Sequence, residues 1–539
     1  MTMEKKIKNL GVMVDCSRNA CYKTETVEKF IDCIARMGYN VLMLYTEDTY
    51  TLEGEPYFGY MRGRYGKEEW KQLDAYARLR GVELIPCIQT LAHLGAITRW
   101  PEYGEKCVDG NDILLVDQPE TYALIEKMFQ WAAECFTSRR IHIGMDEAYT
   151  VGLGRYLDLH GYRPRFEILS NHLKHIEKIA VKYGFSCMLW SDMFVKTANR
   201  GEYYPEPFKM TEEIVDSVPK DMQLVYWDYT HTDQSFYEAM IDGHRKFRNE
   251  LWFSGVAWSC LGFTPHNRYS FKAAKASVAA CREKGVENIL ITTWKDDGAE
   301  SSIFSVLPAL AYIAASAEGK SDEGRASVIF KEATGEEFEE FLCADLPDWV
   351  DGDPLLNNPV KYGLYNDPFL GLFDYHLQEG KSTFFAESAK KLTEISRKSE
   401  YGYVFDTLAK LCSVMELKYD LGIVTRRAYK EKDLTTLRRL GTVVYPEISR
   451  RVGLLYEAFC RQWERECKPN GFEVHDIRLG GLCRRLEHCG KSLADYADGK
   501  IKKIEPLEED ILPFDKNKKQ GEGLLYSIWM NTAMTKPLN

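Results

Sequence analysis

The sequence lacks the long apolar runs of membrane proteins and the leader segment of secreted ones. No stretch of about 18 consecutive apolar residues occurs, so we expect no transmembrane helix and no membrane partner. The N-terminal segment MTMEKKIKNLGVMVD contains only a short apolar run, without the apolar core of a secretory signal. The 15 cysteines form no CxxC pair and no regular framework, which favours reduced thiols. Together these absences predict a cytoplasmic protein.

Motifs for nucleotides, nucleic acids and metals are also missing. No GxGxxG follows the first predicted strand and no P-loop occurs, so nucleotide binding has no support. The chain carries 70 Lys and Arg against 81 Asp and Glu, and its net charge of −11 argues against nucleic acid as a partner. The 11 histidines follow no metal-ligand spacing. We therefore expect neither a metal ion nor another cofactor.

Short apolar runs alternate with helical periodicity through the first 300 residues. Eight runs predict strands: Leu10–Val14, Val41–Tyr45, Glu83–Ile88, Ile141–Met145, Ser186–Trp190, Gln223–Trp227, Trp252–Trp258 and Ile289–Trp294. Segments between them, such as Thr26–Met37 and Glu120–Phe136, place their apolar residues on one helical face. This alternation predicts an α/β fold, a parallel (β/α)8 TIM barrel, with a doubly wound open sheet as the competing arrangement.

The pattern changes after about residue 310, where long segments of helical periodicity replace the strand-like runs. These segments are Phe384–Arg397, Tyr403–Leu421, Asp433–Leu440 and Ile448–Glu466. The stretch Ala344–Asp367, rich in Pro, Asp and Asn, predicts a linker or loop. The sequence thus predicts a barrel domain over residues 1–310 and a mostly α-helical C-terminal domain over residues 311–539.

Two adjacent acidic residues, Asp146 and Glu147, follow the predicted strand Ile141–Met145. In a parallel barrel, functional groups gather where the strands end. Strand alternation puts His142, Gly144 and Asp146 on the face toward the barrel interior. Two neighbouring carboxyl groups repel each other, so one can stay ionised while the other carries a proton as a general acid. That division of labour can break a glycosidic bond, although an Asp-Glu pair can also serve only as a helix cap.

Aromatic residues gather at the ends of the last four predicted strands. These are Trp190, Trp227, Trp258 and Trp294, and Asp192, Asp228 and Asp296 lie close behind three of them. Aromatic planes pack against the apolar faces of sugar rings, while carboxylates accept hydrogen bonds from sugar hydroxyls. A tryptophan at a strand end is usually core packing, but four beside acids favour a sugar-binding site.

Several of these strand ends resemble motifs of the β-N-acetylhexosaminidases of glycoside hydrolase family 20. His142–Glu147 is similar to that family's H-x-G-x-D-E signature, with Met145 where many members have a second glycine. Asp15–Arg18 resembles its first-strand D-x-S-R segment. Gln89–His93 resembles its third-strand D-x-P-G-H segment, with glutamine in place of the aspartate and without the Pro-Gly. The resemblance covers about residues 8–300.

The resemblance implies a role for each strand-end residue. The implied substrate-binding residues are Arg18, His93, Trp190, Trp227, Trp258, Trp294 and Asp296. Arg18 would hold hydroxyls of the terminal sugar, and Asp296, in a segment similar to a W-x-E ending, would bind outer hydroxyls. The tryptophans would wall the acetamido group. Tyr229 would orient the acetamido oxygen, and we favour it over Tyr226 because it shares a strand face with Trp227.

The resemblance also implies the reaction: an exo-acting β-N-acetylhexosaminidase that removes terminal β-linked GlcNAc or GalNAc with retention of configuration. The sugar's own acetamido oxygen would attack C1 and form an oxazolinium, without a protein nucleophile. Asp146 would accept a hydrogen bond from the acetamido N–H, and Glu147 would act as general acid and then general base. The partner is then a small glycan with a terminal N-acetylhexosamine, and similar proteins imply a homodimer formed through the helical region.

Three alternatives stay open at the level of sequence. A conventional retaining glycosidase would use Asp192, Asp228 or Asp296 as its nucleophile. A sugar-binding barrel without catalytic activity would need neither Asp146 nor Glu147. A metal hydrolase would use His142, Asp146 and Asp192, with His93 as a further candidate ligand, but the H-x-H that usually opens such barrels is absent from the first predicted strand.

Overall fold

The computed structural model describes residues 6–296, 298–350, 352 and 356–524. The chain folds into two compact units whose segments interleave along the sequence. The first unit comprises residues 1–257, 270–294 and 307–335, and the second comprises residues 258–269, 295–306 and 336–539. Within the described residues, no helix is long and apolar enough to span a membrane. The domain boundary at residue 310 stays a prediction.

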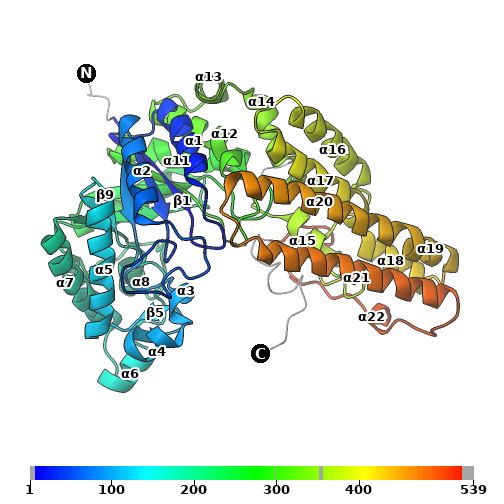
Figure 1. The fold of residues 1–539 in the computed structure, drawn as a ribbon, viewed down its shortest axis with the longest axis horizontal. Helices are drawn as coiled ribbons and strands as arrows, with labels where there is room; N and C mark the ends of the chain where they lie inside the picture. The colour runs from blue at the N-terminus through cyan, green and yellow to red at the C-terminus, as the bar shows by residue number, and fades with distance from the viewer. Residues whose placement is uncertain (1–5, 297, 351, 353–355, 525–539) are drawn as a thin grey trace. The chain divides into compact units, whose positions relative to one another are not determined.

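Eight parallel strands of the first unit close into a barrel (Figure 1). They are β1 (Asn9–Asp15), β2 (Val41–Tyr45), β3 (Glu83–Cys87), β6 (Arg140–His142), β7 (Ser186–Trp190), β8 (Gln223–Trp227), β9 (Leu251–Val256) and β10 (Asn288–Thr293). Neighbouring strands follow the chain order, and β1 closes the ring by pairing with β10, with Asn9 opposite Asn288 and Val14 opposite Thr293. The predicted (β/α)8 TIM barrel is confirmed.

Helices connect the strands and cover the outside of the barrel, as Figure 1 shows for α1, α2, α5 and α7. The helices between and after the strands are α1 (Thr24–Arg36), α2 (Lys67–Leu79), α3 (Gly95–Thr98), α4 (Pro101–Cys107), α5 (Pro119–Cys135), α6 (Arg155–His160), α7 (Arg165–Tyr183), α8 (Asp192–Ala198), α9 (Glu212–Asp216), α10 (Gln234–His244), α11 (Asn267–Lys284), α12 (Leu307–Ala317) and α13 (Glu323–Thr334). A two-stranded hairpin of β4 (Val108–Gly110) and β5 (Ile113–Leu114) lies in the long connection between β3 and β6. In α1, Val27, Phe30 and Ile34 are buried, at the spacing that predicted this helix.

Large apolar side chains fill the barrel interior. The central cluster consists of Met13, Val41, Met43, Tyr45, Ile85, Cys87, Met188, Trp190, Val225, Trp252 and Leu290. Trp227 and Trp294 are partly buried and pack against this cluster. The barrel is therefore a packed core, and its functional groups must lie at its ends rather than inside it.

Two predicted strands extend two or three residues beyond the ends of the observed ones. β6 ends at His142 rather than Met145, because Gly144 and Met145 take φ angles of 70° and 75° and cannot continue a strand. β9 ends at Val256, the last residue that pairs with β10, rather than at Trp258. After His142 the chain therefore turns instead of extending, and this turn decides how the acidic pair is presented.

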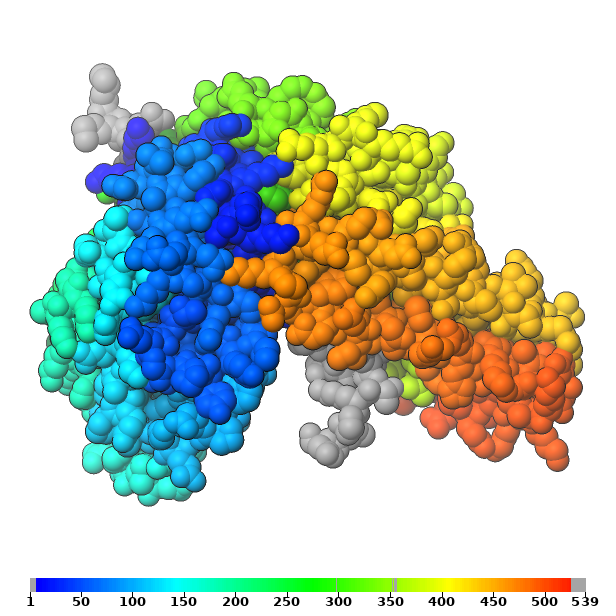
Figure 2. Space-filling model, viewed as in Figure 1, coloured from blue at the N-terminus to red at the C-terminus, as the bar shows by residue number. Residues whose placement is uncertain are grey.

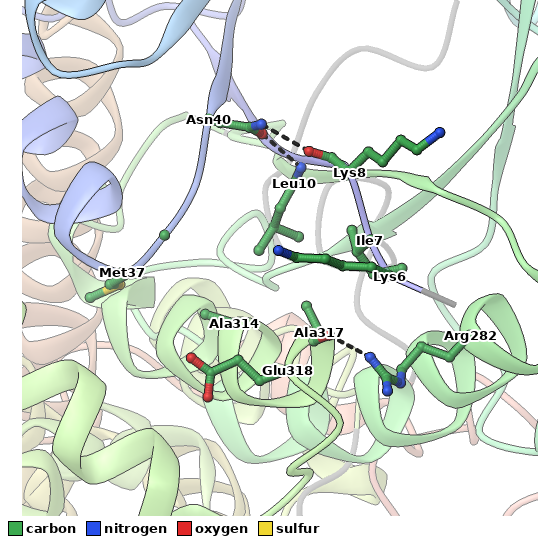
Figure 3. A pocket seen from close by; sticks show the side chains of 11 residues that line it. Lys6, Ile7, Lys8, Leu10, Met37, Asn40, Arg282, Ala314, Ala317 and Glu318 are labelled. Carbon is green, nitrogen blue, oxygen red and sulfur yellow. Dashed lines mark hydrogen bonds between the residues drawn. The ribbon is translucent and has the colours of Figure 1, made fainter. Parts of the chain in front are cut away.

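A pocket of about 420 Å³ lies at the end of the barrel where the strands begin (Figure 3). Its wall includes Leu10 of β1, Asn40 before β2, and Ala314 of α12. The Asn40 side chain accepts a hydrogen bond from the Leu10 amide at 2.9 Å and donates one to the Lys8 carbonyl at 2.9 Å. In TIM barrels this end serves stability rather than catalysis, and the Asn40 contacts tie β1 to the start of β2.

The second unit is built mainly from helices. They are α14 (Phe338–Phe341), α15 (Pro359–Tyr365), α16 (Ser382–Ser396), α17 (Gly402–Lys418), α18 (Leu421–Lys430), α19 (Leu434–Arg439), α20 (Tyr445–Glu466), α21 (Glu473–Ala497) and α22 (Glu505–Glu508). Helices α20 and α21, coloured orange to red-orange in Figures 1 and 2, lie side by side. The helices predicted from periodicity are confirmed as α16, α17, α19 and α20.

The predicted linker over Ala344–Asp367 is wrong in part. A 3-10 helix (Leu342–Asp348) and α15 occupy much of this stretch, and every residue of α15 is buried. Pro359 stands in the first turn of α15, where its missing N–H leaves no intrahelical bond unmade. A composition rich in proline therefore suggested a loop where a short buried helix forms.

A buried ion pair lies in the second unit. Lys361 of α15 places its Nζ 2.9 Å from Glu300 Oε2, and the two side chains are 2% and 0% exposed. Arg478 of α21 contributes a second cation, 3.6 Å from Glu300 Oε1. A buried carboxylate is costly unless it is paired, so these cations are required by the burial of Glu300.

Lys361→Met is expected to lower the free energy of unfolding by about 3 kcal/mol. The substitution removes the nearer cation and leaves the buried Glu300 carboxylate paired with Arg478, which lies farther away. Thermal and denaturant unfolding of the full chain measure the change. The matched control is Lys398→Met, which breaks an exposed pair with Glu340 and should cost less than about 1 kcal/mol. Equal stability of the two variants would contradict the role assigned to the buried pair.

Candidate active site

The acidic pair lies on the turn after β6, at the end of the barrel where the strands finish. His93 Nε2 is 3.1 Å from Asp146 Oδ2 and 3.6 Å from Glu147 Oε2, so one imidazole links both carboxyl groups. The Asp146 side chain is 12% exposed, whereas that of Glu147 is 40% exposed. The two acids therefore occupy different environments, and Glu147 is the more accessible one.

The Gln89 side chain holds this turn from the barrel side. Its Nε2 donates to Asp146 Oδ1 at 2.9 Å and to the Tyr45 hydroxyl at 2.7 Å. Its Oε1 accepts a hydrogen bond from the Met145 amide at 3.2 Å. A Cβ on Gly144 would overlap the Gln89 carboxamide, so residue 144 must be glycine while Gln89 occupies this position.

The turn holds three of its residues in the left-handed region. Gly144, Met145 and Glu147 have φ angles of 70°, 75° and 54°, and His93 has 57°. For residues other than glycine this conformation costs about 1–2 kcal/mol each and persists only where the surroundings impose it. The Gln89 hydrogen bonds to the Met145 amide and the Asp146 carboxylate hold the turn in this form, in which Asp146 is buried and Glu147 is 40% exposed.

The His93–Asp146 pair is the strongest electrostatic feature of the site. Burial alone would lower the pKa of His93, but the Asp146 carboxylate and, further away, Glu47 raise it to about 10. Burial would raise the pKa of Asp146, yet His93 and the hydrogen bond from Gln89 bring it below its usual value. Asp146 is therefore an ionised carboxylate and His93 an imidazolium at neutral pH.

Glu147 is anchored by two further residues. Its backbone amide donates to Asp192 Oδ2 at 3.0 Å, and the Tyr149 hydroxyl donates to its Oε1 at 2.9 Å. Burial, followed by repulsion from Asp146, raises the pKa of Asp192 to about 7. Asp192 thus holds the backbone of the acidic turn by accepting the hydrogen bond of the Glu147 amide.

Arg18 meets acidic partners at the ends of β1 and β2. Its Nη1 lies 3.4 Å from Glu47 Oε1 and its Nε lies 3.3 Å from Asp15 Oδ2. The guanidinium carbon is 6.0 Å from the ring centres of both Tyr45 and Trp294. Burial raises the pKa of Glu47 to about 7, against the lowering effect of Arg18. Asp15 and Glu47 hold the Arg18 side chain, which is 30% exposed and therefore accessible to a polar ligand.

Two tryptophans line the strand ends beside Arg18. The ring centres of Trp190 and Trp294 are 6.4 Å apart, and Trp294 meets Tyr45 edge to face at 4.8 Å. Trp190 is 1% exposed and packs against the His142 ring at 4.7 Å. Burial lowers the pKa of His142 to about 4, so this ring is neutral. The structure thus brings two predicted tryptophans together with Arg18.

Trp227 and Tyr229 form a second aromatic group at the end of β8. Their rings stack with centres 5.2 Å apart. Burial raises the pKa of Tyr229, while hydrogen bonds with Thr292, Trp294 and Ser254 act in the opposite direction. The Tyr229 phenol therefore keeps its proton and lies among side chains from β9 and β10. Tyr226, which the sequence offered as its competitor, is instead fully buried.

The Asp228 carboxylate accepts its hydrogen bonds from residues of the segment around it. It accepts hydrogen bonds from the Tyr226 hydroxyl at 3.0 Å, from His231 Nδ1 at 2.9 Å and from the Thr230 amide at 3.2 Å. Its side chain is fully buried. These contacts fix the segment that carries Tyr229, and they leave Asp228 poorly placed to attack a ligand.

Two predicted sugar contacts belong to the second unit. Trp258 is buried and Asp296 is exposed, and their contact with a sugar stays a prediction. In the described part of the chain, no group of three or more His, Cys, Asp or Glu side chains is arranged to hold a metal ion.

Sequence reasoning missed three residues of the site: Gln89, Glu47 and Tyr149. In the sequence, Gln89 stands out only as a departure from a family motif, although its side chain holds the acidic turn. Glu47 stands in the polar sequence that ends β2, which was the available signal. Tyr149 lies two residues after Glu147, and this short spacing is the sequence signal for its contact with the acid.

The imidazolium state of His93 gives a pH-dependent contribution to stability. Because its pKa rises from 6.5 to about 10 on folding, the contribution is complete below pH 6.5 and is lost as pH rises toward 10. The difference in unfolding free energy between wild type and His93→Gln should therefore shrink across this range in denaturant titrations. In an Asp146→Asn background the same substitution should lose most of this pH dependence. A difference that stays constant from pH 6 to 10 would refute the ion pair.

Two family models match the chain. The model for "Glycosyl hydrolase family 20, catalytic domain" matches residues 10–246, and the model for "Glycoside Hydrolase 20C C-terminal domain" matches residues 339–526. The first covers most of the barrel and the acidic turn, and the second covers most of the helical region. Both descriptions concern the same family, and they match separate parts of this chain.

Individual relatives are more distant. A β-hexosaminidase of Akkermansia muciniphila is 28% identical over 170 residues, and the match covers 26% of this chain and 34% of that protein. Hexosaminidase D of Bos taurus is 24% identical over 318 residues, 53% of this chain and 84% of that protein. The structure of an N-acetyl-β-hexosaminidase from Streptomyces plicatus is 18% identical, with a TM-score of 0.45 over 62% of this chain and 70% of that one. That structural similarity is too low to support a conclusion by itself.

The family assignment therefore follows from the two models, which together match residues 10–246 and 339–526. The chain belongs to glycosyl hydrolase family 20.

Proposed function

We propose that the protein is an exo-acting β-N-acetylhexosaminidase that removes terminal β-linked GlcNAc or GalNAc from a small glycan. The observation that carries this proposal is the contrast within the acidic pair. Asp146 is a buried carboxylate held ionised by His93 and Gln89, and the adjacent Glu147 is 40% exposed. One acid is thus suited to stabilise positive charge and the other to exchange a proton with a ligand.

In the first step, the acetamido oxygen of the bound sugar attacks C1 while Glu147 gives its proton to the departing glycosidic oxygen. The C1–O bond breaks, and an oxazolinium forms within the sugar. Asp146 accepts a hydrogen bond from the acetamido N–H and stabilises the positive charge that develops there. A carboxylate has about four lone-pair sites, so the bonds from His93 and Gln89 leave room for this third donor.

In the second step, Glu147 removes a proton from water, which attacks C1 and releases the sugar with its original configuration. Tyr229 donates a hydrogen bond to the acetamido oxygen, and its stacking on Trp227 limits its motion. Arg18 binds sugar hydroxyls beside Trp294. Trp190, which is 1% exposed, supports Trp294 from the barrel core rather than touching the sugar.

A protein nucleophile fits these surroundings less well. Asp228 already accepts hydrogen bonds from three side-chain and backbone donors. Asp192 is buried, accepts the Glu147 amide and has a pKa of about 7, so it is only partly ionised at neutral pH. Both observations support attack by the substrate's acetamido group.

We also propose a cytoplasmic location and a homodimer. All fifteen cysteines lie in the described residues, and each is a thiol rather than half of a disulfide, which supports a reducing compartment. The homodimer rests on the resemblance of the helical region to family members, and sedimentation analysis of the purified chain tests it.

Glu147→Gln is expected to lower kcat/KM for N,N′-diacetylchitobiose by about 100-fold or more, because the leaving oxygen then departs without a proton. Dinitrophenyl N-acetyl-β-glucosaminide, whose leaving group needs no proton, should be affected far less. Steady-state kinetics on both substrates provide the measurement. Glu68→Gln, at a site 85% exposed on α2, is the matched control. Equal losses on the two substrates would argue against a general acid at position 147.

Asp146→Asn is expected to lower kcat on nitrophenyl N-acetyl-β-glucosaminide by about 100-fold, because a neutral amide cannot stabilise the oxazolinium charge. GlcNAc-thiazoline, which imitates the bicyclic intermediate, should inhibit the wild type and bind the variant more weakly. Near-full activity of Asp146→Asn, or failure of the wild type to bind the thiazoline, would overturn attack by the acetamido group.

A further inference from the structure

A chain of three side chains runs from α8 to the proposed general acid. Lys196 Nζ donates to the Tyr149 hydroxyl at 2.7 Å, and that hydroxyl donates to Glu147 Oε1 at 2.9 Å. The Lys196 ammonium also lies 4.0 Å from the centre of the Tyr149 ring. Arg165 fixes the backbone of the same loop by donating to the Tyr149 carbonyl at 2.7 Å.

Helix α8 holds the acid at two points. Asp192, in its first turn, accepts the Glu147 amide, and Lys196 reaches the Glu147 carboxyl through Tyr149. Residues four apart lie on the same face of a helix, so one face of α8 supports both the backbone and the side chain of the acid. These contacts hold both the backbone and the carboxyl group of Glu147, although its side chain is 40% exposed.

The two oxygens of Glu147 are thereby made different. Oε1 accepts the Tyr149 hydroxyl, whereas Oε2 faces the side of His93 and Asp146, where the reacting sugar would bind. Burial, together with the nearby Glu147 carboxylate, raises the pKa of Tyr149, so the phenol stays a donor. Oε2 is then the oxygen that carries the exchanged proton.

We propose that Tyr149 and Lys196 are positioning residues for Glu147 that speed proton donation to the leaving group. This inference rests on the proposed function. When Glu147 gives its proton away, its carboxyl becomes a carboxylate, and the Tyr149 hydrogen bond becomes charge-assisted and stronger. The Lys196 ammonium polarises the phenol and strengthens that bond further. The pair therefore stabilises the charge that develops during leaving-group departure.

The test is a series of aryl N-acetyl-β-glucosaminides whose leaving phenols range from strongly acidic to weakly acidic, together with N,N′-diacetylchitobiose. Tyr149→Phe and Lys196→Met should lower kcat/KM by about tenfold or more on the poorest leaving groups, the cost of a lost hydrogen bond to a charged group. On the dinitrophenyl substrate they should stay within about twofold of wild type. The slope of log kcat/KM against leaving-group acidity should therefore steepen.

Two control variants accompany them. Tyr162→Phe changes a tyrosine that is 74% exposed on a nearby segment, and Lys178→Met changes an exposed lysine of α7. Both should keep the wild-type slope.

Each remaining outcome overturns a distinct claim. A uniform loss across the series would show that Tyr149 and Lys196 serve folding or binding, and an unchanged series would show that they do not act on Glu147. A wild-type chain that hydrolyses none of these N-acetylhexosaminides would instead refute the proposed function itself, and the inference with it.

Discussion

The burial of one ionised carboxylate, Asp146, is the constraint on which the site depends. A carboxylate that is 12% exposed would take up a proton unless donors surrounded it, and two donors are supplied by His93 and Gln89. The left-handed turn after β6 places the Asp146 carboxylate within reach of the Gln89 amide. The same turn leaves the Glu147 side chain exposed to solvent. The different environments of the two acids are consequences of a single requirement.

The barrel itself contributes rigidity more than chemistry. Its interior is filled by side chains such as Met43, Trp252 and Leu290, so the strand ends are fixed points from which short segments project. Arg18, Trp190 and Tyr229 stand at or just after the ends of three different strands, β1, β7 and β8, and thus at one end of the barrel. These short segments can place functional groups precisely, because each one begins at a strand that is packed in the barrel core.

Periodicity sufficed to predict the barrel, because eight runs of apolar residues carry the strand pattern with little ambiguity. Helix α21 is not among the predicted helices, although its buried Leu479, Leu482, Leu486 and Leu493 keep a helical spacing. The acidic pair was visible in the sequence, but its support was not. Gln89 lies 57 residues from Asp146, and no local pattern reveals that its amide reaches the turn. Contacts of this kind depend on tertiary packing alone.

The close approach of Gln89 to Gly144 has an evolutionary consequence. An aspartate at position 89 could accept from the Met145 amide but could donate to neither Asp146 nor Tyr45. Any larger residue at position 144 would collide with the glutamine. Residue 144 is therefore confined to glycine for as long as glutamine stands at position 89. The dependence runs in one direction: a carboxylate at position 89 is compatible with this glycine, but it would remove the donors to Asp146 and Tyr45 and leave the acidic turn to be held by other contacts.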